Sequence, residues 1–181
     1  NLKNYEDAKR FYDKAFIFAR DPIDKMALAN NLGIVYHNEK QYDKAVSIYK
    51  KMIDSVGPKS EFYPKLLLNY SRAKWFQNPD YNPVDNYLIA EKLSKDWKDD
   101  WTKDAAYAYL SAYYLDKNTD SAKFYAEKML SLAKDLKYPQ DQLEALQNLI
   151  RITDGAHSQK YFDEYSRIQD SLVNAQNKAK N

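Results

Sequence analysis

Apolar residues recur along most of this chain at the spacing of an α-helix. They fall at steps of three and four in two clear runs, the first comprising Tyr5, Ala8, Tyr12, Ala15 and Ala19 and the second comprising Tyr42, Ala45, Tyr49 and Met52. Such steps place the residues on one face of a helix. The sequence has no Asn-Gly or Asp-Gly pair between alternating runs, the usual mark of a β-hairpin. The pattern predicts an all-α protein.

Start signals separate the helical runs. Asp21-Pro22 places a capping carboxylate before a proline at the first helical position, and Asn82-Pro83 repeats the arrangement. Proline disfavours helical geometry in the residue before it, so Pro58 and Pro139 mark further boundaries. These signals predict about nine helices joined by short connections, over residues 2–19, 22–38, 41–54, 60–77, 83–97, 102–116, 119–136, 140–153 and 157–177.

A pattern of small and aromatic residues repeats along the chain. Leu32-Gly33 is followed by Tyr36 on one predicted helix, and Ala45, Tyr49 and Met52 lie on the next. A small residue lets two helix backbones approach, and an aromatic side chain on the partner fills the groove beside it. Further copies follow at intervals of 37 to 39 residues, namely Ala8, Tyr12 and Ala15; Pro83, Tyr87 and Ala90; Ala122, Ala126 and Met129; with first-helix pairs Tyr70-Ser71 and Leu110-Ser111.

These residues resemble the tetratricopeptide repeat, although its standard period is about 34 residues and Lys74 and Pro83 depart from its pattern. The resemblance implies a right-handed α-solenoid of about 4.5 antiparallel helix pairs, because stacking the pairs completes the core. We therefore expect a single domain over 1–181, with a half repeat at 1–20 and repeats at about 21–57, 58–98, 99–137 and 138–178.

The closing stretch carries a second resemblance. Residues 161–165 (Tyr-Phe-Asp-Glu-Tyr) and 169–172 (Gln-Asp-Ser-Leu) are similar to the last helix of the repeat-containing sensor regions of bacterial membrane-bound signalling proteins. Such regions precede a transmembrane helix and a histidine kinase or a DNA-binding output domain. The resemblance implies an extracytoplasmic sensor region within a regulatory protein.

Composition excludes several kinds of site. The chain has no cysteine, which excludes disulfides, thiolate zinc sites and a cysteine nucleophile. Its three glycines are isolated and form no phosphate-binding loop, and no HExxH motif is present. With a formal net charge of only +2, the chain lacks the excess of basic residues that is typical of a nucleic-acid binder. We expect no enzymatic activity, no cofactor, no metal and no nucleic-acid partner.

A few polar and aromatic residues lie at positions where a binding role and a structural role are both conceivable. His37 is interpreted as a surface histidine favoured by the helix dipole at a helix end. Asp99-Asp100 are expected to cap a helix, and Asp163-Glu164 to lie on a solvated face. Most tyrosines occupy packing positions. Trp75, near Arg72, fits a recognition site and packing against the next helix equally well.

In tetratricopeptide stacks the first helices line a concave groove that binds peptides or helices. The resemblance maps this groove onto Asn30, Ile34, His37, Arg72, Trp75, Ala108, Ala112, Leu115, Asn148 and Arg151. Asn30, Arg72, Asn148 and Arg151 have the residue types of the carboxylate clamp that holds peptide termini, but their spacing differs from it, which argues against binding of chaperone tails.

The helix predicted at 2–19 carries Phe11, Tyr12, Phe16 and Phe18 without its partner helix. An uncovered aromatic face marks an association surface, such as a homodimer interface, or a point where the chain was cut from a longer protein. We favour the cut, because the chain begins with Asn1 rather than Met.

These observations predict a non-enzymatic scaffold that binds a protein or peptide, placed periplasmically in a membrane-anchored signal-transduction protein. No apolar run approaches the roughly 20 residues that cross a bilayer, so any membrane contact would come from segments outside this chain. The alternatives are a cytoplasmic adaptor or assembly factor, an RNA-binding helical repeat, and a helical-toroid enzyme acting on carbohydrate, the last of which needs more helices.

Overall fold

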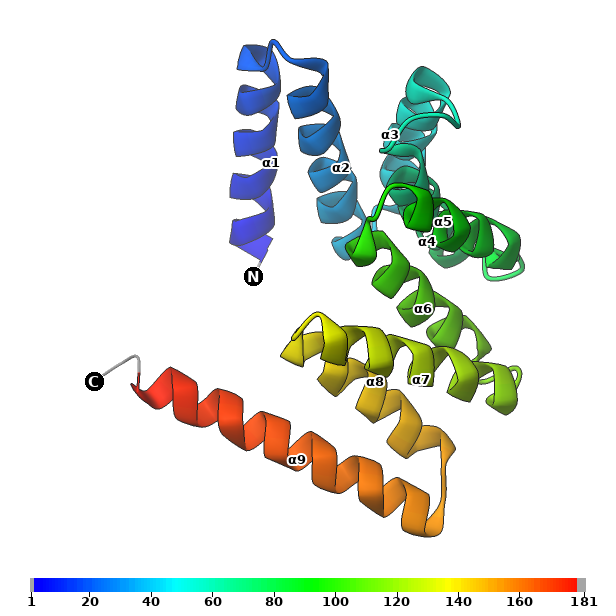
Figure 1. Cartoon of the computed structure of the whole chain (residues 1–181). Coiled ribbons are helices and arrows are strands. Elements are labelled where there is room, and N and C mark those ends of the chain that lie inside the picture. The colour runs from blue at the N-terminus through cyan, green and yellow to red at the C-terminus, as the bar shows by residue number, and fades with distance from the viewer. Residues whose placement is uncertain (1, 179–181) are drawn as a thin grey trace. The chain divides into compact units, whose positions relative to one another are not determined.

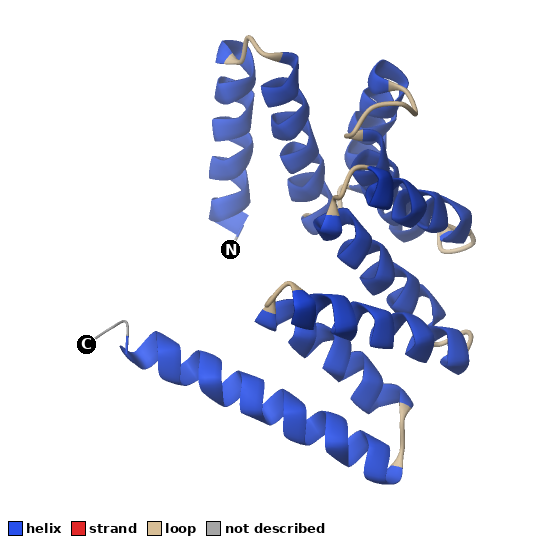
Figure 2. Ribbon diagram, in the orientation of Figure 1, coloured by secondary structure: helices blue, strands red, loops and turns tan. Residues whose placement is uncertain are grey.

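A computed structural model describes residues 2–178, and its regular structure over that range is entirely helical (Figure 2). The helices are α1 (Leu2–Phe18), α2 (Pro22–Asn38), α3 (Tyr42–Val56), α4 (Tyr63–Gln77), α5 (Val84–Asp96), α6 (Asp100–Tyr114), α7 (Thr119–Asp135), α8 (Pro139–Ile152) and α9 (Gly155–Lys178). Over the described residues, the predicted all-α class and the predicted number of helices are confirmed. Each observed boundary lies within three residues of its prediction.

The capping residues act as the sequence predicts. The carboxylate of Asp21 accepts a hydrogen bond from the backbone N–H of Ile23 at 2.7 Å and begins α2. Asn82 accepts from the N–H of Val84 at 3.1 Å at the start of α5. Asp99 accepts from the N–H of Thr102 at 3.0 Å, so Asp99 caps α6. Each bond satisfies a donor that the first helical turn would otherwise leave unpaired.

The helices form two compact units, Asn1–Thr102 (unit 1) and Lys103–Asn181 (unit 2). Within unit 1, each of α1 to α4 packs on the helix that follows it in the chain, and α2 also touches α4. Within unit 2, α7 packs on α8 and α8 on α9, and the Ser111 hydroxyl donates to the carbonyl of Ala122 at 3.2 Å between α6 and α7. Consecutive helices therefore run as neighbouring pairs in each unit, as Figure 1 shows for α1 and α2.

The core of unit 1 contains the small–aromatic contact that the repeat pattern predicts. Ala45 and Tyr49 on α3 are buried, together with Met52. A Cβ atom built on Gly33 of α2 would lie 2.5 to 2.8 Å from three atoms of the Tyr49 phenol. That separation is too short for any side chain, so glycine is what lets Tyr49 lie across α2.

The core of unit 2 is built from α6, α7 and α8. Its buried residues are Tyr107, Ala108, Ala126, Met129, Leu130, Ala145, Leu146 and Leu149. The 24-residue helix α9 has no buried residue over its whole length and covers this core with half-buried Tyr161, Tyr165 and Ile168. This last helix therefore covers the core without joining its interior.

Three lysines occupy turns with left-handed backbone geometry. Lys40, Lys98 and Lys137 have φ values of 61°, 54° and 58° and lie just after α2, α5 and α7. Residues with a Cβ atom pay a steric cost there, which is smaller for asparagine and absent for glycine. The sequence did not predict these three turns, because lysine stands where glycine usually marks a positive φ.

None of the helices in the described part of the chain is long and apolar enough to cross a membrane.

Candidate ligand-binding site

The residues assigned to a concave groove in unit 1 make specific contacts within the fold. The Asn69 amide on α4 donates to the side-chain oxygen of Asn30 on α2 at 3.0 Å. The Tyr49 hydroxyl donates to the backbone carbonyl of Asn30 at 3.3 Å. Asn30 therefore joins α2 to both α3 and α4. Ile34, on the same side of α2, is half-buried.

His37 is a buried residue, so the expectation of a surface histidine is wrong. Only 8% of it is exposed, and its ring lies edge-on to Tyr42 and Phe76 at centroid distances of 5.3 and 5.0 Å. Its Nδ1 has no hydrogen-bond partner among the described residues. Burial, and secondarily the positive charge of Arg72, lower the pKa of His37 to about 4. The neutral imidazole packs as an aromatic side chain because Phe76 of α4 covers it.

Arg72 and Trp75 both lie beside Phe76, the residue that covers His37. The Arg72 guanidinium lies 5.9 Å from the centroid of Phe76, and the Trp75 ring lies 5.2 Å from it. Both residues are half-buried, whereas Phe76 is 45% exposed. The structure thus gathers His37, Tyr42, Arg72, Trp75 and Phe76 into one group, named here the Phe76 cluster. Phe76 is not among the residues predicted to line the groove.

The groove residues assigned to unit 2 have unequal environments. Ala108 is buried in the core, so it lines no open surface, whereas Ala112 is exposed and Leu115 half-buried. The Asn148 amide donates to the Ser111 hydroxyl at 3.4 Å. The guanidinium of exposed Arg151 pairs with the Asp116 carboxylate at 2.8 Å. A binding role for these residues stays a prediction.

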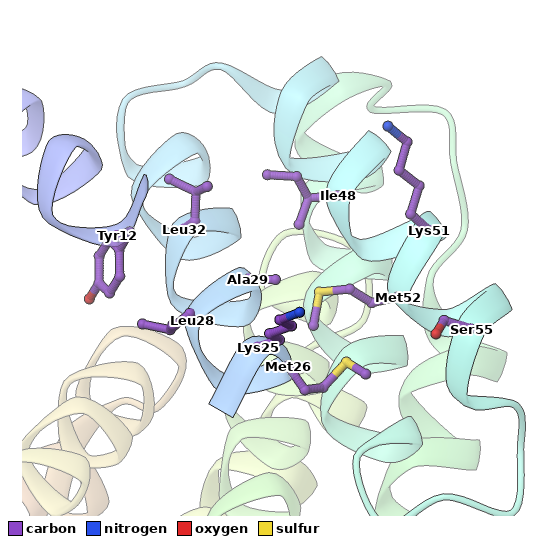
Figure 3. A pocket seen from close by; sticks show the side chains of 10 residues that line it. All are labelled: Tyr12, Lys25, Met26, Leu28, Ala29, Leu32, Ile48, Lys51, Met52 and Ser55. Carbon is purple, nitrogen blue, oxygen red and sulfur yellow. The ribbon is translucent and has the colours of Figure 1, made fainter. Parts of the chain in front are cut away.

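Unit 1 also contains an apolar pocket that the sequence analysis missed. It has a volume of about 430 Å³ and lies among α1, α2 and α3. Figure 3 shows Ala29 and Leu32 of α2 facing Ile48 and Met52 of α3. The lining residues are Tyr12 of α1; Lys25, Met26, Leu28, Ala29 and Leu32 of α2; and Ile48, Lys51, Met52 and Ser55 of α3.

The pocket and the predicted groove use different sides of α2. Lys25, Ala29 and Leu32 follow one another at helical spacing on the pocket side, and Asn30, Ile34 and His37 do so on the groove side. At 3.6 residues per turn, the two sets are separated by roughly 140° around the helix axis. The signal that could have shown the pocket is that the apolar residues of α2 are spread around the helix and do not form one face, because a helix with apolar residues on several sides packs on more than one of them.

The charged residues at the pocket have one sign. Lys25 comes from α2 and Lys51 from α3, and both are exposed. Among the described lining residues none is Asp or Glu. Nearby Asp54 faces Lys50, whose ammonium donates to it at 3.3 Å. The pocket therefore offers an apolar interior beside two positive charges and one hydroxyl, that of Ser55.

Unit 2 has a hollow of opposite character between α8 and α9. It measures about 740 Å³, and polar residues such as Asp141, Glu144 and Gln147 dominate its lining.

The carboxyl group of Asp104 on α6 is buried, and its Oδ1 lacks a hydrogen-bond partner within residues 2–178. Burial, followed by repulsion from Asp141 and then Glu144, raises the pKa of Asp104 to about 7. Within residues 2–178, no group of three or more His, Asp or Glu side chains is placed to hold a metal ion.

The comparisons with known proteins bear on the fold. No family model matches this sequence, and no curated protein matches it. Among solved structures, the crystal structure of BtubC (BKLC) from P. vanneervenii is similar, with a TM-score of 0.74 and 18% sequence identity. The match covers 94% of this chain and 75% of BtubC. At this identity the likeness shows a shared helical fold.

Proposed function

We propose that this chain is a non-enzymatic scaffold of the tetratricopeptide kind that binds a protein or peptide. The observation that carries the proposal is the run of consecutive helix pairs packed by small–aromatic contacts such as Gly33 with Tyr49. Repeated pairs of this kind present extended surfaces for partners. The apolar pocket of unit 1 supplies a concave surface of the size used for ligands. The likeness to BtubC supports the fold, and the binding role is argued from these surfaces.

The proposed setting is the extracytoplasmic sensor region of a bacterial regulatory protein, supported by the residues of the closing stretch, 161–165 and 169–172. The alternative is a cytoplasmic adaptor. The coding DNA beyond Asn181 distinguishes them. About 20 apolar codons followed by Lys and Arg codons support the membrane-anchored sensor, whereas further polar helices or a stop codon support the adaptor.

A peptide-display selection tests the binding role. The purified chain is immobilised and panned against a random peptide library, and the enriched peptides are measured by titration calorimetry in solution. We expect a reproducible sequence motif that binds with one-to-one stoichiometry. If independent selections yield no common motif, or if enriched peptides produce no heat of binding, the proposal is wrong.

The same peptides locate the binding surface. The double variant Arg72→Glu with Trp75→Ala alters the Phe76 cluster, and we expect it to keep the helical circular dichroism of the parent because both side chains are partly exposed. If the predicted groove is the binding surface, this variant abolishes binding of the selected peptides. Undiminished binding excludes the groove and leaves the scaffold role to other surfaces.

A further inference from the structure

We infer that the pocket among α1, α2 and α3 binds an amphipathic helix of a partner protein, in which acidic residues flank the apolar residues that enter the pocket. The inference rests on the proposed binding function and names its partner by chemistry. It also places the contact on a side of α2 roughly 140° around the helix axis from the groove residues predicted on this helix, Asn30, Ile34 and His37.

The interior of the pocket selects apolar side chains. Leu28, Leu32 and Ile48 line it together with Met26 and Met52, which bring unbranched side chains from two different helices. Methionine side chains adapt to irregular partners because they have several rotatable bonds and a polarisable sulfur atom. A partner that fills the volume of about 430 Å³ removes this surface from water, which is the main favourable contribution to association.

The scarcity of hydrogen-bonding groups favours a helix over an extended peptide. The polar side chains that line the pocket are the Tyr12 phenol, the Ser55 hydroxyl and the two lysine ammoniums. An extended peptide brings unpaired backbone N–H and C=O groups that need partners when buried. A helix pairs these groups within itself and presents apolar residues at three- and four-residue spacing. A helix therefore fits beside the antiparallel helices α2 and α3.

Charge complementarity selects acidic flanks. Lys25 and Lys51 lie 26 positions apart in the sequence and are brought to one pocket by the packing of α2 on α3. Asp24 and Asp54, their neighbours in the sequence, are not among the described residues that line the pocket. Two like charges beside an apolar surface attract carboxylates and repel basic partners.

The test uses two matched panels of fluorescein-labelled peptides of 16 residues. All members have helix-favouring alanine backgrounds and carry Leu, Met or Phe at positions i, i+3 and i+4, with Glu flanks in one panel and Lys flanks in the other. Binding to the full chain is followed by fluorescence anisotropy. We expect members of the Glu panel to bind at least tenfold more tightly than their Lys counterparts, with the difference shrinking as salt is raised.

Two double variants with the same net charge identify the surface. Lys25→Glu with Lys51→Glu reverses the charge at the pocket, and we expect at least tenfold weaker binding of the Glu panel and stronger binding of the Lys panel. Lys92→Glu with Lys160→Glu makes the same change at exposed positions of α5 and α9 outside the pocket lining and is expected to leave the preference intact. All four sites are exposed, so circular dichroism should match the parent.

Several results would overturn the inference. It is wrong if no Glu-panel peptide binds, if both double variants weaken binding equally, or if sodium laurate binds the pocket while the peptides do not, since the last result identifies a small acyl ligand. If display-selected peptides bind but are lost only in the Arg72→Glu, Trp75→Ala variant, the scaffold function stands and this pocket is not its binding surface.

Discussion

Units 1 and 2 are built alike from consecutive helix pairs but surround hollows of opposite chemistry. The hollow among α1, α2 and α3 of unit 1 is apolar, with Lys25 and Lys51 beside it, whereas the hollow between α8 and α9 of unit 2 is lined mainly by acids and amides. The buried titratable groups also differ, because unit 1 buries the neutral imidazole of His37 and unit 2 buries the carboxyl of Asp104. The same arrangement of helix pairs therefore allows hollows of different polarity and charge between the helices. The function of each unit has to be inferred from its own side chains.

The substitution with the largest expected effect lowers the stability of unit 1 alone. Ala45 on α3 is fully buried against α2, so Ala45→Asp places an unpaired carboxylate in the core at a cost of about 4 kcal/mol. We expect hydrogen exchange to accelerate throughout α2 to α4, measured by mass spectrometry. Ala27→Asp, at an exposed position of α2, is the control and should change little. A melting temperature of Ala45→Asp equal to that of the parent would refute the assigned helix packing.

The second effect is a pH dependence of opposite sign in the two units. The pKa of His37 falls from 6.5 to about 4 on folding, so between these values the unfolded chain binds more protons and unit 1 loses stability as pH falls. The pKa of Asp104 rises from 3.8 to about 7, so unit 2 loses stability as pH rises through that window. Each change should be on the order of 1–3 kcal/mol. Hydrogen exchange of each unit at pH 4.5 and 7.5, corrected for intrinsic rates, measures them.

Two substitutions test whether the titrations of His37 and Asp104 cause these pH dependences. His37→Phe keeps an aromatic ring against Tyr42 and Phe76 and should remove most of the acid sensitivity of unit 1. Asp104→Asn should stabilise unit 2 at pH 8 and have a much smaller effect at pH 4, where the carboxyl is neutral in the folded state and only about half ionised in the unfolded state. Identical pH profiles in the parent and both variants would contradict the assignment. Asp141, whose pKa burial also raises, contributes to unit 2 in the same direction as Asp104.

The smallest effect concerns the turns that both units share. Lys40 and Lys137 have positive φ values, which glycine adopts without steric cost. We expect Lys40→Gly in unit 1 and Lys137→Gly in unit 2 each to raise the free energy of unfolding by about 1 kcal/mol in urea titrations. Lys92→Gly, inside α5, should instead lower it by about 1 kcal/mol. If all three variants are destabilised alike, these turns carry no conformational strain.

The sequence alone determined the helices and their local contacts. The spacing of apolar residues, the capping by Asp21, Asn82 and Asp99, and the pairing of Gly33 with Tyr49 could all be predicted. These features depend on residues within one helix or on two helices adjacent in the chain. Backbone geometry and short connections constrain such neighbours strongly.

Only the tertiary structure decided the environment of side chains that contact helices distant in the sequence. His37 is buried because Phe76, 39 positions later, covers it, and Ala108 is a core residue because α7 and α8 pack around it. The apolar pocket forms where α1, α2 and α3 leave volume unfilled, and the polar hollow forms between α8 and α9. Helical periodicity identifies the apolar sides of a helix, but the neighbour that covers each side, and the space left between them, depend on packing of the whole unit.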